Sequence, residues 1–100
     1  MEFSNQSPPV SVFCHLRVEA GWGEIDPAVA SAALSKSLAI VTAYEAGKAI
    51  GFARAVGDGI MYFYICDMIV KKSHRGKGVA TALMEHLMQQ IRTLAPQGAT

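Results

Sequence analysis

The sequence predicts one domain of the α/β (α+β) class, in which a mostly antiparallel central sheet is flanked by helices in the order β-α-β-β-β-α. Three observations predict this class. Apolar residues alternate over short runs typical of strands, two such runs are separated by a hairpin-like turn, and the last long segment repeats apolar residues at steps of three and four. A length of 100 residues fits a single domain.

The composition is that of a globular chain with a substantial core. Hydrophobic residues make up 51% of the chain and charged residues 17%, with a formal net charge of +1. This balance argues against broad electrostatic capture of nucleic acid or of an anionic membrane, and we expect neither partner. No secretory signal and no apolar run of the about 20 residues that span a bilayer are visible, so we expect a cytoplasmic location.

The first part of the chain is predicted to hold a tail, a strand and a helix. Residues 1–9 are polar and contain prolines, which favours a flexible tail before a domain over residues 10–100. Residues 10–19 are expected to form a strand, because apolar side chains recur there with period two. The side chains that share this parity are Val12, Cys14, Leu16 and Val18. Asp26 and Pro27 then open a helix over residues 28–37, as N-cap and first helical residue.

The second part of the chain is predicted to hold three strands and a helix. Strands over residues 38–45 and 49–56 are joined by the turn Ala46-Gly47-Lys48, and Gly57-Asp58-Gly59 forms the next turn. Residues 60–70 are apolar or aromatic except Asp67, which is typical of a central strand covered on both faces. An amphipathic helix follows over residues 79–94, and Pro96 and Gly98 end it.

The cysteines and histidines do not indicate a metal site. Cys14 and Cys66 lie far apart without the paired spacing of zinc ligands, so we expect reduced thiols and no metal. Cys66 has no neighbouring base in the sequence, which favours packing over nucleophilic chemistry. His86 is expected to be solvated on the polar side of the last helix.

The segment Arg75-Gly76-Lys77-Gly78-Val79-Ala80 joins the predicted strand to the last helix. Glycines allow the backbone to approach an anion closely, and the N–H groups of a first helical turn carry partial positive charge. The segment is neither a Walker A loop nor a dinucleotide fingerprint, because GxxxxGK[ST] and GxGxxG are both missing. It is therefore a candidate phosphate-binding turn.

These residues fit the pattern [QR]-x-x-G-x-[GA], and by it the chain resembles the GCN5-related N-acetyltransferase (GNAT) family over roughly residues 10–100. The preceding segment Asp67-Met68-Ile69-Val70-Lys71-Lys72-Ser73-His74 is similar to the strand end and turn of that family. Gly51-Phe52-Ala53-Arg54, followed by Gly57-Asp58-Gly59, is similar to its third strand and turn.

The resemblance implies acetyl-coenzyme A as co-substrate and direct attack by a primary amine, without an acyl-enzyme. It places the pyrophosphate on the backbone N–H groups of the turn and of the first helical residues, with Thr81 assisting. The residues concerned are Gly76, Lys77, Gly78, Val79 and Ala80. Arg75 would brace the turn or touch phosphate, and the main chain of Ile69 and Val70 would pair with the pantetheine arm.

Catalytic and acceptor-binding residues are implied less directly. Asp67 is either a base or a carboxylate paired with backbone or an arginine, since buried charges are paired. Tyr64 is either an acid/base residue or, with Tyr62 and Phe63, part of an aromatic core or acceptor-pocket wall. Trp22 and Glu24 fall where relatives bind the acceptor, although Trp22 could equally anchor its loop to the core.

The resemblance also implies a fifth strand, a further helix that carries the acid for the leaving thiolate, and a final hairpin. The sequence has no residues for these elements after Thr100, so we expect the C-terminal strands to be missing. A bare apolar edge on the strand over residues 60–70 would favour a homodimer. Two alternatives to an acetyltransferase therefore stay open, a CoA-binding module with little catalysis and a dimeric interaction domain.

Overall fold

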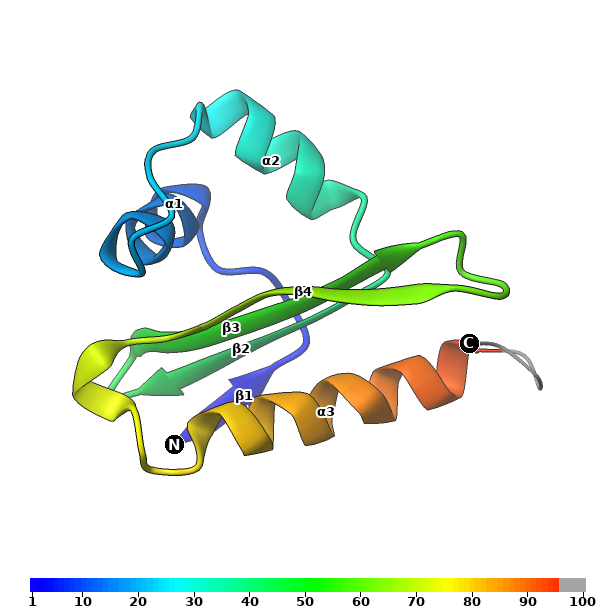
Figure 1. Ribbon diagram of the computed structural model, residues 1–100. Helices are drawn as coiled ribbons and strands as arrows, with labels where there is room; N and C mark the ends of the chain where they lie inside the picture. Colours follow the sequence, from blue (N-terminus) through cyan, green and yellow to red (C-terminus); the bar gives the residue numbers. More distant parts are fainter. Residues whose placement is uncertain (96–100) are drawn as a thin grey trace.

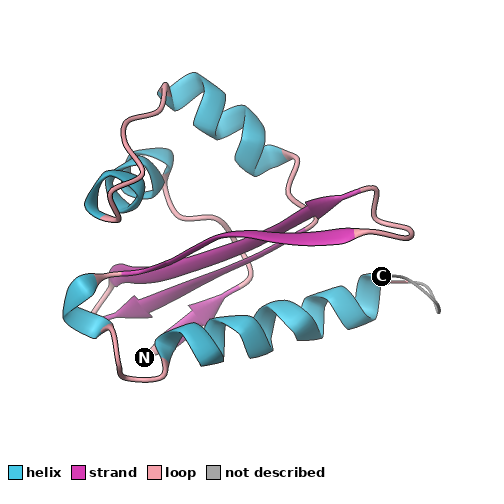
Figure 2. Cartoon of the chain, in the orientation of Figure 1, coloured by secondary structure: helices cyan, strands magenta, loops and turns pink. Residues whose placement is uncertain are grey.

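The protein has three layers, with one antiparallel sheet between helices on its two faces (Figure 1). The structure is a computed structural model and describes residues 1–95. In chain order the elements are β1 (Glu2–Ser4), α1 (Val10–Glu19), α2 (Pro27–Ser35), β2 (Ala39–Glu45), β3 (Lys48–Gly57), β4 (Phe63–Val70), the short 3-10 helix η1 (Lys72–His74) and α3 (Val79–Leu94). Figure 2 shows the same elements coloured by type, with α1 and α2 on one face of the sheet and α3 on the other.

The sheet has the strand order β1-β2-β3-β4, and every neighbouring pair is antiparallel. The β2–β3 hairpin is tight, because Glu45 pairs with Lys48 and only two residues lie between them. Those residues, Ala46 and Gly47, have φ values of 51° and 77°, as the two central residues of a type I′ turn require. The hairpin predicted at this position is confirmed.

Two hydrophobic clusters hold the layers together. One joins the sheet to α3, whose inner face buries Val79, Leu83, Leu87 and Ile91. The other joins the opposite face of the sheet to α1 and α2. Gly51 allows α3 to approach the sheet, since a Cβ atom there would lie 3.0 Å from Leu83 Cδ1 and 3.2 Å from Val79 Cγ1.

The prediction of a strand over residues 10–19 is wrong, because this segment is the helix α1. The chain turns into the helix at Pro9, and the two side chains that α1 buries fully are Phe13 and Leu16, at a helical spacing of three. Val18, which the strand pattern places inside, is 47% exposed. The segment carries both apolar periods, and packing against α2 and the sheet selects the helical one.

The two ends of the predicted sheet also differ from expectation. Residues 2–4, expected to belong to a flexible tail, pair with β2 as the outer strand β1, so the order is β-α-α-β-β-β-α. The last strand begins at Phe63 and not at residue 60, and it is the edge strand of the described sheet, with Tyr64 76% exposed. The prediction of a central strand covered on both faces is therefore wrong for β4.

The remaining predictions of elements are confirmed where the structure describes them. Asp26 accepts a hydrogen bond from the Ala28 N–H at 2.8 Å as the N-cap of α2, and Pro27 is its first residue. α3 spans Val79–Leu94 as predicted, whereas Pro96 and Gly98 lie outside the described residues. Within residues 1–95, no helix combines the length and apolar character needed to cross a membrane.

Candidate active site

The turn between η1 and α3 has the backbone geometry of an anion cradle. Gly76 and Gly78 adopt left-handed φ values of 76° and 80°, which other residues adopt only with strain. A Cβ atom built on either glycine would meet nothing within 4 Å, so the space before the turn is open. Glycine is required at these two positions by the backbone conformation and not by lack of room for a side chain. An anion can therefore reach the backbone of this turn.

The N-terminus of α3 directs unpaired N–H groups into this space. Gly78 is its N-cap and provides no side-chain cap, and the first helical hydrogen bond runs from Ala82 N to Gly78 O at 3.1 Å. The N–H groups of Val79, Ala80 and Thr81 consequently have no acceptor inside the helix. A cavity of about 270 Å³ lies here, and seven predicted cofactor residues line it: Val70, Arg75, Gly76, Gly78, Val79, Ala80 and Thr81.

The end of β4 supplies free backbone groups beside the turn. Lys71 N–H donates to Ile50 O at 2.8 Å, and by the alternation of antiparallel pairing Ile69 also directs its backbone groups to β3. The groups of Val70 then point to the open edge, where Val70 O accepts a hydrogen bond from Arg75 Nε at 3.1 Å. Arg75 thus braces the turn against β4, and Val70 rather than Ile69 offers backbone groups to a ligand.

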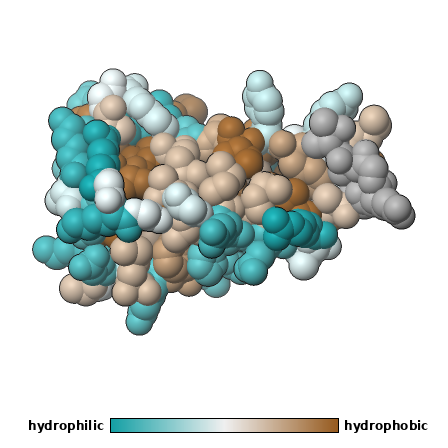
Figure 3. Space-filling model, turned by 60° about the horizontal axis from the view of Figure 1, so that its bottom comes forward, coloured by the Kyte–Doolittle hydropathy of each residue, from teal (hydrophilic) through white to brown (hydrophobic). Residues whose placement is uncertain are grey.

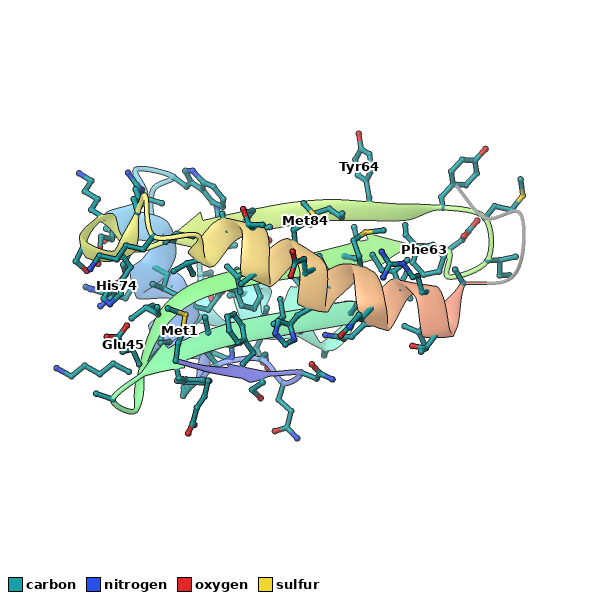
Figure 4. All side chains as sticks on the ribbon, turned by 90° about the horizontal axis from the view of Figure 1, so that it is seen from below. Met1, Glu45, Phe63, Tyr64, His74 and Met84 are labelled. Carbon is teal, nitrogen blue, oxygen red and sulfur yellow. The ribbon has the colours of Figure 1, made fainter. Side chains whose placement is uncertain are left out.

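His74 belongs to the basic cluster visible in the sequence, but its contact with Glu45 is a site feature that the sequence analysis missed. Its ring lines the cavity at the turn, and its Nε2 lies 3.1 Å from Glu45 Oε2 at the end of β2, while Nδ1 lies 2.8 Å from Ser73 Oγ. Figure 4 shows the Glu45 and His74 side chains together at this end of the molecule. The pair ties the turn to the sheet across 29 residues of sequence, so no local pattern could have indicated it.

This end of the molecule is also its polar end. In Figure 3 hydrophilic side chains gather at the left, where η1 and the turn lie in Figure 1, and apolar side chains occupy the middle of the same face. The basic residues Lys71, Lys72, Arg75 and Lys77 fall within seven consecutive positions here. The local charge suits a phosphorylated ligand although the chain as a whole is nearly neutral.

β4 is irregular at Asp67, three residues before Val70, whose backbone groups point to the open edge. The register shifts between Phe52 and Arg54 of β3, and Asp67 has a left-handed φ of 54°. One extra residue is therefore accommodated in β4 as a β-bulge, which bends the strand and increases its twist. Asp67 tolerates this conformation better than most residues do.

The Asp67 carboxylate is held by two arginines from different layers. Arg54 Nε on β3 donates to Oδ2 at 2.6 Å, and Arg17 Nη1 on α1 lies 3.4 Å from Oδ1. Arg54 Nη1 also donates to Ala33 O and Ser37 Oγ at the end of α2. The side chain of Asp67 is only 14% exposed, so the cluster joins α1, α2 and the bulge in a largely buried network.

The aromatic residues at the start of β4 divide between core and solvent. Phe63 packs on the cluster beneath α3, whereas Tyr62 and Tyr64 are 57% and 76% exposed. Their exposure excludes the aromatic core for the two tyrosines, whereas the acceptor-pocket wall and the acid/base role of Tyr64 stay predictions. Figure 4 shows Tyr64 pointing away from the edge of β4, where its hydroxyl is accessible.

Trp22 and Glu24 lie between α1 and α2, not after a strand as expected. α1 ends in a Schellman motif, in which Trp22 N–H donates to Arg17 O at 2.9 Å and Gly21 N–H to Val18 O at 3.0 Å. The Arg17 guanidinium lies 5.6 Å from the centre of the Trp22 ring. Glu24 lines a neighbouring cavity of about 430 Å³. Arg17 thus connects this loop to Asp67.

The surroundings of the cysteines and of His86 do not indicate catalytic or metal-binding roles for these side chains. Burial raises the pKa of the Cys66 thiol, which disfavours the reactive thiolate, and both cysteines are free. His86, expected to be solvated, is only partly exposed, because its ring stacks on Phe3 of β1 with centroids 4.3 Å apart. Within residues 1–95 no three His, Cys, Asp or Glu side chains are grouped as metal ligands would be.

Comparison with known proteins identifies the family. The profile of the Acetyltransferase (GNAT) family matches residues 8–98. A probable acetyltransferase from meticillin-resistant Staphylococcus aureus superposes with a TM-score of 0.90 and 30% identity, covering 99% of this chain and 74% of that one. An aminoglycoside 6′-N-acetyltransferase complexed with coenzyme A has the same fold, with a TM-score of 0.78 and 19% identity over 93% of this chain and 56% of its own.

The chain belongs to the GNAT family. It is also similar to serotonin N-acetyltransferase 2, chloroplastic, from Oryza sativa subsp. japonica, with 40% identity over 48 residues. That match spans 48% of this chain and only 24% of the rice protein. The expected GNAT-like architecture, a central antiparallel sheet flanked by helices, is confirmed.

Proposed function

We propose that this protein transfers an acetyl group from acetyl-CoA to a primary amine. The observation that carries the proposal is the open turn before α3, where left-handed glycines and the uncapped N–H groups of Val79, Ala80 and Thr81 surround a cavity. Such an arrangement suits a pyrophosphate. Membership of the family and a related fold solved with coenzyme A support the choice of ligand.

The donor is proposed to extend from the turn along the open edge of β4. The pyrophosphate would accept hydrogen bonds from the backbone of residues 76–81, with Lys77 contributing charge. The Val70 N–H would bind the pantetheine arm. The reacting thioester would then lie further along β4, toward the β-bulge at Asp67, where the strand bends.

The acceptor amine is proposed to approach from the loop that contains Trp22 and Glu24. Glu24 is exposed and offers a negative charge to a cationic amine. We propose Asp67 as a positioning residue and not as the base, because both its oxygens already lie beside guanidinium groups. Tyr64, exposed on the same strand, is the proposed acid for the leaving thiolate.

Calorimetric titration with acetyl-CoA tests donor binding. Gly78→Glu should abolish binding, because a carboxylate would occupy the space of the pyrophosphate and repel it. Gly23→Glu is the matched control, since Gly23 also has a left-handed φ, of 83°, with nothing within 4 Å of its Cβ position. Retained affinity in Gly78→Glu would refute the placement of the pyrophosphate.

Release of free thiol with a panel of primary amines tests transfer. Turnover by the wild type, and its loss in Tyr64→Phe with donor affinity unchanged, is the expected result. A CoA-binding module with little catalysis is the second candidate, favoured by the engagement of Asp67 with two arginines. Tight donor binding without thiol release for any amine would select it.

We further propose that the protein is a homodimer through β4. In the described sheet β4 pairs only with β3, and Tyr64 and Ile65 on it are exposed. Two copies could therefore pair edge to edge about a twofold axis over residues 63–65, at the end of β4 that the proposed donor does not reach. Light scattering at micromolar concentration should give twice 10.7 kDa, and a monomer mass would refute the dimer. The cytoplasmic location and the lack of nucleic-acid and membrane partners stay predictions.

A further inference from the structure

A second cavity lies at the same end of the sheet as the turn, but on the face covered by α1. Its volume is about 520 Å³, and its walls come from the first two turns of α1, from the β2–β3 hairpin and from Lys71. It shares no lining residue with the cavity at the turn. The proposed acetyl-CoA site therefore does not account for it.

The deep wall of this cavity is apolar. Leu16 is 1% exposed and Ala49 8% exposed, and the half-buried Val12 of α1 also lines the cavity. A volume within the usual range of small-molecule sites, with an apolar wall and a few polar groups, is typical of a ligand pocket. The shape thus suits a compact apolar body of a small organic molecule.

The polar groups at the rim are basic. Lys48 and Lys71 both line the cavity, together with Tyr44, and no carboxylate does. Within residues 1–95 the ion pairs are made by arginine and histidine, so neither ammonium group has an acidic partner. His15 at the rim already faces Glu19, at 3.7 Å. Two unpaired cations beside an apolar wall disfavour an amine and favour an anion.

We propose that this cavity binds a small monocarboxylate with an apolar body, such as an arylacetic or branched aliphatic acid. The carboxylate lies between Lys48 and Lys71 and accepts a hydrogen bond from the Tyr44 hydroxyl, while the apolar body contacts Val12 and Leu16. The site is separate from the acetyl-CoA site and has the opposite charge preference to the proposed amine site. It stands whether or not the protein transfers acetyl groups.

Titration of ¹⁵N-labelled protein with phenylacetate and with 4-methylpentanoate, followed by amide NMR, tests the proposal. We expect saturable shifts of amides in residues 9–16 and 44–49 at millimolar ligand. The neutral phenylacetamide should bind about tenfold more weakly, which is about 1.4 kcal/mol. Phenethylamine, which carries the opposite charge on the same ring, should not bind.

Alanine variants distinguish the effect of Lys48 and Lys71, which line the cavity, from that of the other basic side chains at the same end of the molecule. Lys48→Ala and Lys71→Ala should each weaken binding of phenylacetate by about tenfold, whereas Lys72→Ala, an exposed lysine outside the cavity, should not. The amide spectrum of each variant reports whether it is folded. Saturation with coenzyme A should leave phenylacetate binding unchanged.

Three results would overturn the proposal. The first is the absence of shifts with both acids at millimolar concentration. The second is equal binding of acid and amide, which would leave the lysines without a role. The third is displacement of phenylacetate by coenzyme A, which would make the cavity part of the donor site. Failure of acetyl-CoA to bind would count against the proposed function and not against this cavity.

Discussion

Replacing Asp67 by Asn separates a structural from a catalytic role for this carboxylate. Asn keeps the size of the side chain and tolerates the left-handed φ of 54°, so backbone strain stays the same. The change removes the negative charge between Arg54 at 2.6 Å and Arg17 at 3.4 Å, and places an amide group toward one of them. Both arginine side chains are mostly buried, at 15% and 21% exposed, and neither can turn fully to water.

The expected cost follows from these contacts. A charge-assisted hydrogen bond contributes about 1.5–3 kcal/mol, and breaking a buried pair costs about 3–5 kcal/mol. Because Asn still offers one acceptor to Arg54, which keeps its bonds to Ala33 O and Ser37 Oγ, we expect a loss of about 2 kcal/mol. At about 4–8 °C per kcal/mol for a domain of this size, the midpoint of thermal unfolding should fall by roughly 8–16 °C.

Urea unfolding of Asp67→Asn, with the exposed Glu85→Ala as control, measures this cost directly. Glu85→Ala should change the free energy of unfolding by less than about 0.5 kcal/mol. If Asp67→Asn is as stable as the wild type but loses thiol release by about 100-fold or more, Asp67 is a general base and the positioning role is refuted.

Three further changes test the packing, the helix start and a loop. Gly51→Ala should lower the free energy of unfolding by about 1–3 kcal/mol in urea, because its Cβ atom would lie 3.0 Å from Leu83 Cδ1; an unchanged midpoint would contradict the close approach of α3. Asp26→Ala should cost about 1 kcal/mol in the same assay through loss of the cap on Ala28, with Asp26→Asn nearly neutral. Hydrogen bonds from the backbone N–H groups of residues 60–62, with that of Tyr62 the largest contribution, lower the pKa of the Asp58 carboxyl. The stability that Asp58 adds to the fold is therefore complete above its pKa in the unfolded chain, about 3.9, and is lost as the pH falls through its lower pKa in the folded protein. The stability advantage of the wild type over Asp58→Ala should therefore vanish in strong acid, and a pH-independent difference would exclude this cause.

The elements that could be predicted are those with local signals. Asp26-Pro27 marks the start of α2, Ala46-Gly47 marks the hairpin, and the apolar repeat of α3 has a single period. α1 could not be predicted, because its apolar residues fit a strand and a helix alike and contacts from α2 decide between them. The strand β1 is three residues long and depends on pairing with a strand some 40 residues away.

The candidate site divides in the same way. The anion cradle depends on local backbone geometry at Gly76 and Gly78, so its residues are recognisable in sequence. The network around Asp67 and the His74–Glu45 pair join residues 13 to 50 positions apart, which only the fold brings together. The exposure of Tyr64 likewise follows from the position of β4 at the edge of the described sheet, which its apolar sequence did not indicate.

Amide NMR with coenzyme A and with pantetheine, which lacks the pyrophosphate, tests the central claim most directly. Coenzyme A should shift the amides of Gly76, Gly78, Val79, Ala80 and Thr81 most strongly, because their N–H groups would donate to the pyrophosphate. Pantetheine should leave these five amides unshifted. Equal shifts with both ligands, or coenzyme A shifts located away from the turn, would contradict the assignment of this turn as the pyrophosphate site.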